Sequence, residues 1–217
     1  MQNFSLSVYN GITDDCTDKR MKKGIIYIHG KGGNAEEAAH YKPLFPEYDV
    51  VGFDYKSKTP WDAEREFVKF YDSFCKEYRS VSIIANSIGA YFALSAFGDK
   101  KIESAYFISP IVNMENLISD MLLWANATEE DLKKRGVIET DFGETLSWEY
   151  LSYVKRQRLS WEKPTKILYG SKDNLQSIDT IRSFADKTGA ELTVMEGGEH
   201  WFHTAEQTKF LDNWITE

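Results

Sequence analysis

A serine lies at the centre of the pentapeptide Ala85-Asn86-Ser87-Ile88-Gly89, where a short apolar run gives way to a helical pattern. The run over residues 81–85 is brief and rich in β-branched side chains, as is typical of a buried parallel strand. Apolar residues then recur at helical spacing over residues 91–97. A serine in such a strand-to-helix turn has a strained backbone and an exposed hydroxyl, and the close approach of strand and helix requires small neighbours. Ser87 is therefore a candidate nucleophile, and the alternative is a helix N-cap.

An acid and a histidine follow two later apolar runs. Asp173 lies in Gly170-Ser171-Lys172-Asp173, directly after the predicted strand at 167–169. His200 lies in Gly197-Gly198-Glu199-His200-Trp201-Phe202, directly after the predicted strand at 192–195. The chain order Ser, Asp, His, with each residue after a different strand, is one of several unrelated orders in which this triad occurs.

A glycine-rich segment, His29-Gly30-Lys31-Gly32-Gly33, adds a fourth landmark after the predicted strand at 25–28. With these four landmarks the chain resembles the α/β-hydrolase superfamily over nearly its whole length, although Ala85 replaces the glycine that usually begins the serine turn. The resemblance implies an α/β-hydrolase fold, with a mainly parallel, doubly wound sheet of about six to seven strands. It also implies that the glycine-rich segment resembles the HG-x-G oxyanion loop of that fold.

Roles follow from the chemistry of acyl transfer. Serine needs a base to take its proton, which is the role expected of His200, and Asp173 would fix the imidazole tautomer. By the resemblance, the oxyanion hole would be formed by the backbone N–H groups of Lys31 and Ile88. The supporting loop residues would be His29, Gly30 and Gly32, with His29 as an orienting residue.

Each assignment has a rival in the sequence. His203 competes with His200, but His200 has the G-x-H-x-F setting of the family. Asp54 also ends a predicted strand, but Asp173 matches the family spacing better. The remaining candidates, Asp141, Glu144 and His40, are expected to be surface groups.

Composition favours one globular domain over residues 1–217, because 217 residues with 42% hydrophobic content can bury a substantial core. The net charge of −8 argues against a nucleic-acid partner. No apolar run approaches the ~18 residues of a spanning helix, and the N-terminus lacks a signal-peptide pattern, so a cytoplasmic location is expected. Cys16 and Cys75 are not spaced as C-x-x-C, and the four histidines form no ligand pattern, so we expect reduced thiols, no metal and no cofactor.

Strands and helices are predicted to alternate, with ligands bound beyond the carboxyl ends of the strands. Further predicted strands lie at 50–53 and 105–108, with an edge strand at 4–9, and helices begin at Thr59-Pro60, after Ser177 and after Thr204. Between Pro110 and Pro164 no strand is predicted. Helices are expected there from Asn113 to Trp124, from Thr128 to Gly136, and around residues 148–154.

The resemblance implies that residues 111–163 form a helical lid over the site. Its predicted contributions to a substrate pocket for a small-molecule acyl compound are Met114, Trp124, Trp148 and Tyr153. The alternative is an ordinary helical insertion that packs at the edge of the sheet.

Two other functional hypotheses come from different classes. Gly30-x-Gly32-x-x-Ala35, with Asp54 ending the next strand, fits a dinucleotide fingerprint and would make the chain a nicotinamide-dependent oxidoreductase. The helix after Ala35 is cut short near Pro43, and this hypothesis leaves the ordered serine, aspartate and histidine unexplained. A catalytically silent, hydrolase-like binding module is the third hypothesis. The preferred hypothesis is a serine hydrolase that cleaves a carboxylic ester or related acyl bond through an acyl-enzyme.

Overall fold

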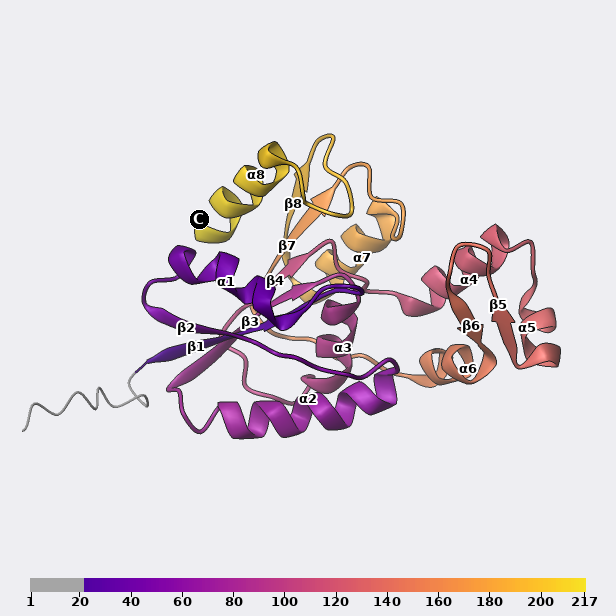
Figure 1. Cartoon of the computed structure of the whole chain (residues 1–217), viewed down its shortest axis with the longest axis horizontal. Coiled ribbons are helices and arrows are strands. Elements are labelled where there is room, and N and C mark those ends of the chain that lie inside the picture. Colours follow the sequence, from indigo (N-terminus) through magenta and orange to yellow (C-terminus); the bar gives the residue numbers. More distant parts are fainter. Residues whose placement is uncertain (1–21) are drawn as a thin grey trace, which may run out of the picture.

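The computed structural model describes residues 22–217, and a six-stranded sheet forms its centre (Figure 1). The strands run in the order β2-β1-β3-β4-β7-β8, and every neighbouring pair is parallel. They are β1 (Lys23–Ile28), β2 (Tyr48–Gly52), β3 (Ser80–Asn86), β4 (Ala105–Ile108), β7 (Thr165–Gly170) and β8 (Glu191–Met195). The predicted parallel, doubly wound sheet is confirmed. The predicted strand at 4–9 lies outside the described residues.

Helices cover both faces of this sheet. One face is covered by α1 (Ala38–Tyr41) and α8 (Ala205–Thr216), and the other by α2 (Pro60–Phe74), α3 (Ile88–Ala96) and α7 (Ile178–Thr188). The predicted cap at Thr59 is confirmed, and the helices predicted after Ser177 and Thr204 are capped by these two residues. Thr59, Ser177 and Thr204 each accept a hydrogen bond from a backbone N–H of the helix that follows.

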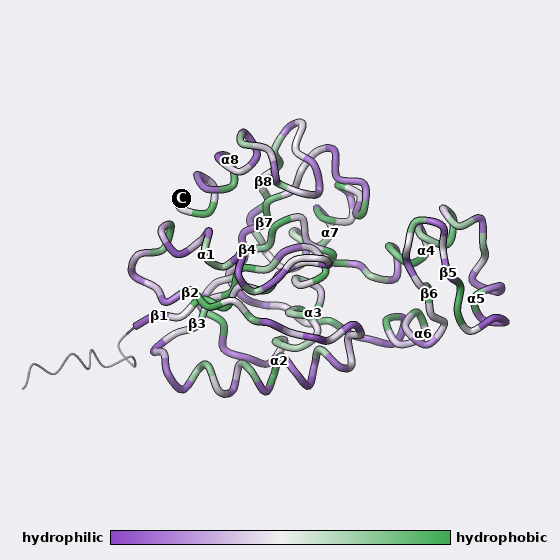
Figure 2. Tube along the Cα trace, in the orientation of Figure 1, coloured by the Kyte–Doolittle hydropathy of each residue, from purple (hydrophilic) through white to green (hydrophobic). Residues whose placement is uncertain are grey.

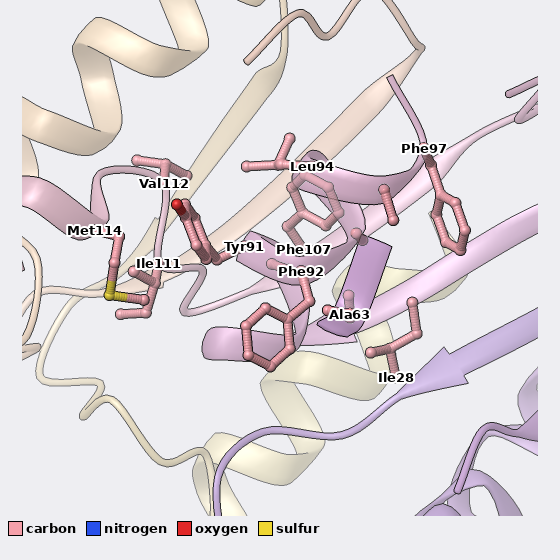
Figure 3. Close-up of a cluster of buried hydrophobic side chains, with 14 of the residues drawn as sticks. Ile28, Ala63, Tyr91, Phe92, Leu94, Phe97, Phe107, Ile111, Val112 and Met114 are labelled. Carbon is pink, nitrogen blue, oxygen red and sulfur yellow. The ribbon is translucent and has the colours of Figure 1, made fainter. Parts of the chain in front are cut away.

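Two hydrophobic cores lie on the two faces of the sheet. Apolar residues concentrate in the central strands and α3, whereas α2 alternates between polar and apolar residues along its length (Figure 2). Around α3 the larger core joins Phe92 to Ile28 of β1 and Phe107 of β4, and continues to Met114 (Figure 3). Residues of β3 and α3 are buried in this core, so close packing of the two elements fixes the position of the turn between them.

The chain between β4 and β7 forms a separate group of elements, drawn at the right of Figure 1. It contains α4 (Met114–Trp124), α5 (Glu129–Arg135), β5 (Val137–Glu139), β6 (Thr145–Ser147) and α6 (Trp148–Arg156). The three helices and the caps at Asn113 and Thr128 agree with the sequence prediction. The prediction that this region contains no strand is wrong, because β5 and β6 pair as an antiparallel hairpin. Each strand is only three residues long and buries one residue, Ile138 or Leu146, so its alternation is too short to read.

Side-chain hydrogen bonds tie this insertion to the rest of the molecule. The Tyr153 hydroxyl donates to Glu64 of α2 at 2.6 Å. Buried Gln176, in the loop before α7, accepts from the backbone N–H of Val112 and Asn113 at 3.1 and 2.9 Å. The insertion is therefore anchored at its first connection and through α6. Among residues 22–217, no helix combines the length and apolar character needed to cross a lipid bilayer.

Candidate active site

Ser87 adopts the strained conformation that the serine turn was expected to have. Its φ of 50° and ψ of −121° are rare for a residue with a Cβ. Neighbouring backbone groups hold it there: its N–H donates to the carbonyl of Ile108, and its own carbonyl accepts from Ala90 and Ile111, at 3.0–3.1 Å. Its hydroxyl makes no capping bond to α3. The N-cap alternative therefore does not describe the side chain.

The glycine-rich segment after β1 passes directly over the serine turn. A Cβ at Gly30 would lie 3.2 Å from the Cβ of Ser87, and a Cβ at Gly89 would lie 2.4 Å from the carbonyl oxygen of His29. The segment closes a turn in which Gly33 N–H donates to the Gly30 carbonyl, with Gly32 at a φ of +78°. The small residues at this crossing are therefore required by the distance between two backbones.

His29 supports this segment from below. Its buried ring stacks on Tyr55 at a centroid distance of 4.2 Å, and the Tyr55 hydroxyl donates to the His29 carbonyl at 2.8 Å. Burial raises the pKa of Tyr55 well above its ordinary value, so that hydroxyl keeps its proton. These two contacts fix the ring and the carbonyl group of His29 at the start of the glycine-rich segment.

The loops after β7 and β8 are joined by backbone hydrogen bonds. Ser171 N–H donates to the carbonyl of Met195, and Lys172 N–H donates to that of Gly198, at 3.0 and 2.8 Å. A Cβ at Gly170 would lie 2.5 Å from the carbonyl of Gly198, so the contact requires glycine. These bonds fix the loop that carries Asp173 against the loop that carries His200.

Three predicted side chains meet at the carboxyl ends of β3, β7 and β8. The Oγ of Ser87 lies 2.9 Å from Nε2 of His200, and Nδ1 of His200 lies 2.7 Å from Oδ2 of Asp173. The other carboxylate oxygen of Asp173 accepts from the Leu175 N–H at 2.8 Å. The Asp173 side chain is only 1% exposed, whereas that of His200 is 20% exposed. The arrangement pairs an accessible imidazole with a shielded carboxylate.

The rival residues lie elsewhere. The ring of His203 contacts the carbonyl of Trp201 at 2.6 Å and is exposed. Asp54 forms an exposed ion pair with Lys56, and His40 forms one with Asp212, each at 2.7 Å. Asp141 is exposed, as expected, and the half-buried Glu144 contacts the Lys31 ammonium. This last contact joins the hairpin of the insertion to the glycine-rich segment.

Two backbone amides are available near the serine. Ile88 is the first residue of α3, so its N–H has no partner within the helix. Lys31 occupies the second position of the Gly30–Gly33 turn, whose hydrogen bond does not use the Lys31 N–H. These are the two amides that the resemblance names for an oxyanion hole.

Ser87 and His200 line a cavity of about 480 Å³ that extends toward α1 and α8. Its lining includes the polar side chains of Tyr27, Glu37, Tyr41 and Asn86 and the apolar side chains of Ile108, Leu175, Phe202 and Leu211. Trp201, which is 74% exposed, also lines it. The cavity can accept an amphipathic small molecule.

The structure does not place the four predicted pocket residues on this cavity. Met114 lines a separate cavity of about 370 Å³ between α4, α6 and α7. Trp124 packs on Phe142, Trp148 lies under the Lys133 ammonium, and the Tyr153 hydroxyl contacts Glu64. The correction has a physical reason: the apolar faces of α4 and α6 pack on each other, on the hairpin and on α2, while the cavity opens toward α1 and α8.

Sequence reasoning missed a hydrogen-bonded group beside the serine. Nδ2 of Asn86 donates to the Tyr27 hydroxyl at 2.8 Å, which donates to Glu37 at 2.5 Å. Glu37 completes a capping box with Asn34. The spacing Asn34-x-x-Glu37 is a capping-box signal that could have indicated where this carboxylate lies.

The dinucleotide fingerprint lacks its structural context. The segment after Gly30-x-Gly32 forms a 3-10 turn (Ala35–Glu37) and the four-residue helix α1, followed by a second 3-10 turn (Lys42–Leu44). The fingerprint requires a full helix that crosses the sheet and points its N-terminus at the pyrophosphate. Within the described part of the chain, no cluster of histidine, cysteine, aspartate and glutamate side chains is arranged to hold a metal ion.

Comparisons with known proteins give a consistent fold. No family model matches the chain. One curated protein, "Putative esterase/lipase 3" of Mycoplasma genitalium, is 24% identical in an alignment of 106 residues that covers 43% of this chain and 38% of that protein. The match thus spans well under half of the relative's length.

Solved structures match nearly the whole chain. Est1E from Butyrivibrio proteoclasticus superposes with a TM-score of 0.77 at 16% identity, covering 92% of this chain and 87% of that one. The same protein with ferulic acid bound gives 0.73 at 17% identity, covering 93% and 90%. The alpha/beta hydrolase domain-containing protein 10 from mouse gives 0.71 at 15% identity, covering 95% and 90%. At these identities the likeness concerns the fold.

Proposed function

Starting from the α/β-hydrolase fold of this chain, we propose that the protein is a serine hydrolase that cleaves a carboxylic ester or a related acyl bond. The observation that carries the proposal is the pair of contacts at His200, 2.9 Å to Ser87 and 2.7 Å to Asp173. Its geometry is that of a nucleophile, a base and an orienting carboxylate. The names of the neighbours, which include esterases, support the same class.

In the proposed mechanism, the Asp173 carboxylate holds the His200 proton on Nδ1, so that Nε2 can accept the proton of the Ser87 hydroxyl. Ser87 Oγ attacks the acyl carbon, and the oxyanion that forms accepts hydrogen bonds from the N–H groups of Lys31 and Ile88. Collapse of the tetrahedral intermediate breaks the bond to the leaving alcohol, which takes the proton from His200. Water then repeats the sequence, and the acid and free Ser87 are released.

The substrate we propose is a small acyl compound that binds in the 480 Å³ cavity. A neighbour that binds ferulic acid fits this size class. We assign the insertion over residues 111–163 to the entrance of the site, because Glu144 on its hairpin contacts Lys31. Loss of one oxyanion donor typically costs on the order of 10²–10³ in turnover. The position of the glycine-rich segment, which carries the Lys31 N–H, should therefore affect the rate.

The test is kinetic and uses three variants on a p-nitrophenyl ester, with His203→Ala as the matched control for His200→Ala. Ser87→Ala is expected to reduce hydrolysis to within ~10³–10⁴ of the uncatalysed rate. His200→Ala is expected to do the same, while His203→Ala, three residues away and facing solvent, retains activity. Full activity in Ser87→Ala would contradict the proposal, and absence of hydrolysis in the unmodified protein would favour the silent binding module.

A further inference from the structure

A carboxylate lies in the lining of the cavity that contains Ser87 and His200. Glu37 is the last residue of the 3-10 turn that follows the glycine-rich segment, and it is exposed and lines this cavity. A Cβ at Gly33 would lie 2.7 Å from Oε1 of Glu37, so the carboxylate packs on the backbone of that segment. It therefore adjoins the loop expected to bind the oxyanion.

Two donors fix the orientation of this carboxylate. Oε1 accepts from the Asn34 N–H at 3.1 Å, and Oε2 accepts from the Tyr27 hydroxyl at 2.5 Å. The Tyr27 hydroxyl in turn accepts from Asn86, the residue before Ser87. A carboxylate offers about four lone-pair positions, so Glu37 keeps about two for a further donor. The side chain is thus held rigid with acceptor capacity to spare.

The negative charge of Glu37 has no cationic partner among residues 22–217. The cavity also contains Lys31 and His40, but the Lys31 ammonium is paired with Glu144 and His40 is paired with Asp212. An unpaired carboxylate in the lining of a cavity attracts hydrogen-bond donors and repels anions. Glu37 therefore favours molecules that carry a hydrogen-bond donor over anionic ones.

We propose that Glu37 determines substrate specificity by accepting a hydrogen bond from a hydroxyl or protonated amine on the substrate. This inference rests on the proposed hydrolase function. Leu175, Phe202 and Leu211 line the same cavity and would contact the apolar part of that substrate. The preferred substrates are then esters that carry a donor group on an otherwise apolar acyl or alcohol half.

The test compares matched esters in the full-length protein. One series is methyl 3-phenylpropanoate with hydrogen, hydroxyl or aminomethyl at the para position, which places the donor on the acyl half. The other is propyl butyrate against 2,3-dihydroxypropyl butyrate, which places it on the alcohol half. The variant is Glu37→Gln, which keeps the capping box but has one carbonyl oxygen, already needed by Asn34 and Tyr27. The control is Glu36→Gln, which removes the same charge from the same turn, outside the cavity lining.

We expect the unmodified protein to prefer the donor-bearing ester in at least one series. The preference is the kcat/KM for the donor-bearing ester divided by that for the matched ester without a donor. Glu37→Gln lowers this ratio on the order of tenfold, as expected for loss of a hydrogen bond to a charged group, and Glu36→Gln leaves it unchanged. Equal ratios in the Glu37→Gln and unmodified proteins, with hydrolysis that still depends on Ser87, overturn the specificity role alone. Hydrolysis that does not depend on Ser87 overturns the proposed function, and this inference with it.

Discussion

Replacement of Gly89 by alanine tests whether the crossing of the two backbones sets the geometry of the site. An added Cβ would lie 2.4 Å from the His29 carbonyl oxygen and 2.9 Å from Ile28. Carbon–oxygen contacts in proteins are about 3.3–3.6 Å, so relief of the clash requires a movement of roughly 1 Å. Helix propensity alone would make the same substitution favourable by about 0.5–1 kcal/mol, so the two effects have opposite signs.

The movement separates the segment that carries the Lys31 amide from the turn that carries Ser87. Overpacking of this kind costs about 1–3 kcal/mol of unfolding free energy, and a displacement of about 1 Å in a catalytic site costs on the order of 10²-fold in rate. We expect Gly89→Ala to show both losses, measured by denaturant unfolding and by kcat/KM on a p-nitrophenyl ester.

The control is Gly189→Ala, at the C-terminal end of α7. Gly189 has a φ of +71° with open space around it, so alanine there costs about 1–2 kcal/mol by backbone strain alone. It lies at the amino end of the edge strand β8, whereas Ser87 lies at the carboxyl end of the central strand β3. Gly189→Ala is expected to lose stability and keep activity. Unchanged activity in Gly89→Ala, or an equal loss in both variants, would refute the argument.

Two further predictions concern Asp173 and the buried tyrosines. Asp173→Asn should lower kcat on the order of 10⁴-fold, because an amide at this position favours the wrong tautomer of His200; a loss of less than tenfold would remove Asp173 from the triad. Burial raises the pKa of Tyr169 and of Tyr71 to about 12, whereas an exposed tyrosine has a pKa near 10. The folded state therefore holds these two protons more tightly than the unfolded state, and this contribution to stability is complete at pH values below 10. Unfolding free energy should therefore fall as the pH rises from 10 toward 12. Tyr169→Phe should show a smaller fall in chemical denaturation at pH 9 and pH 11, and equal falls would contradict this.

The sequence predicted the fold and the site best where a local pattern of residue types allows only one backbone conformation. The short, β-branched runs and the capped helices located all six strands of the main sheet and the helices around them. The small residues flanking Ser87 correctly indicated a close backbone crossing at Gly89. The loops of Asp173 and His200 were recognised by their order along the chain, and the structure places the two side chains 2.7 Å apart.

Features that depend on side-chain packing over long sequence distances were not predictable in the same way. The direction of the cavity depends on α1 and α8, whose residues are separated by most of the chain. Four residues of the insertion, Met114, Trp124, Trp148 and Tyr153, were therefore assigned to a cavity that they do not line. The hairpin β5–β6 was missed because it pairs only three residues on each strand. The contact of Glu37 with Tyr27 joins a loop to a buried strand position, and only its capping-box spacing was visible beforehand.

The most direct test of the account is to treat the protein with a fluorophosphonate and map the modified residue by mass spectrometry. We predict a single adduct on Ser87, absent in Ser87→Ala and formed far more slowly in His200→Ala, because only a serine activated by its histidine reacts readily. An adduct on another residue, or no adduct in a protein that still hydrolyses esters, would contradict the claim that Ser87, His200 and Asp173 act together.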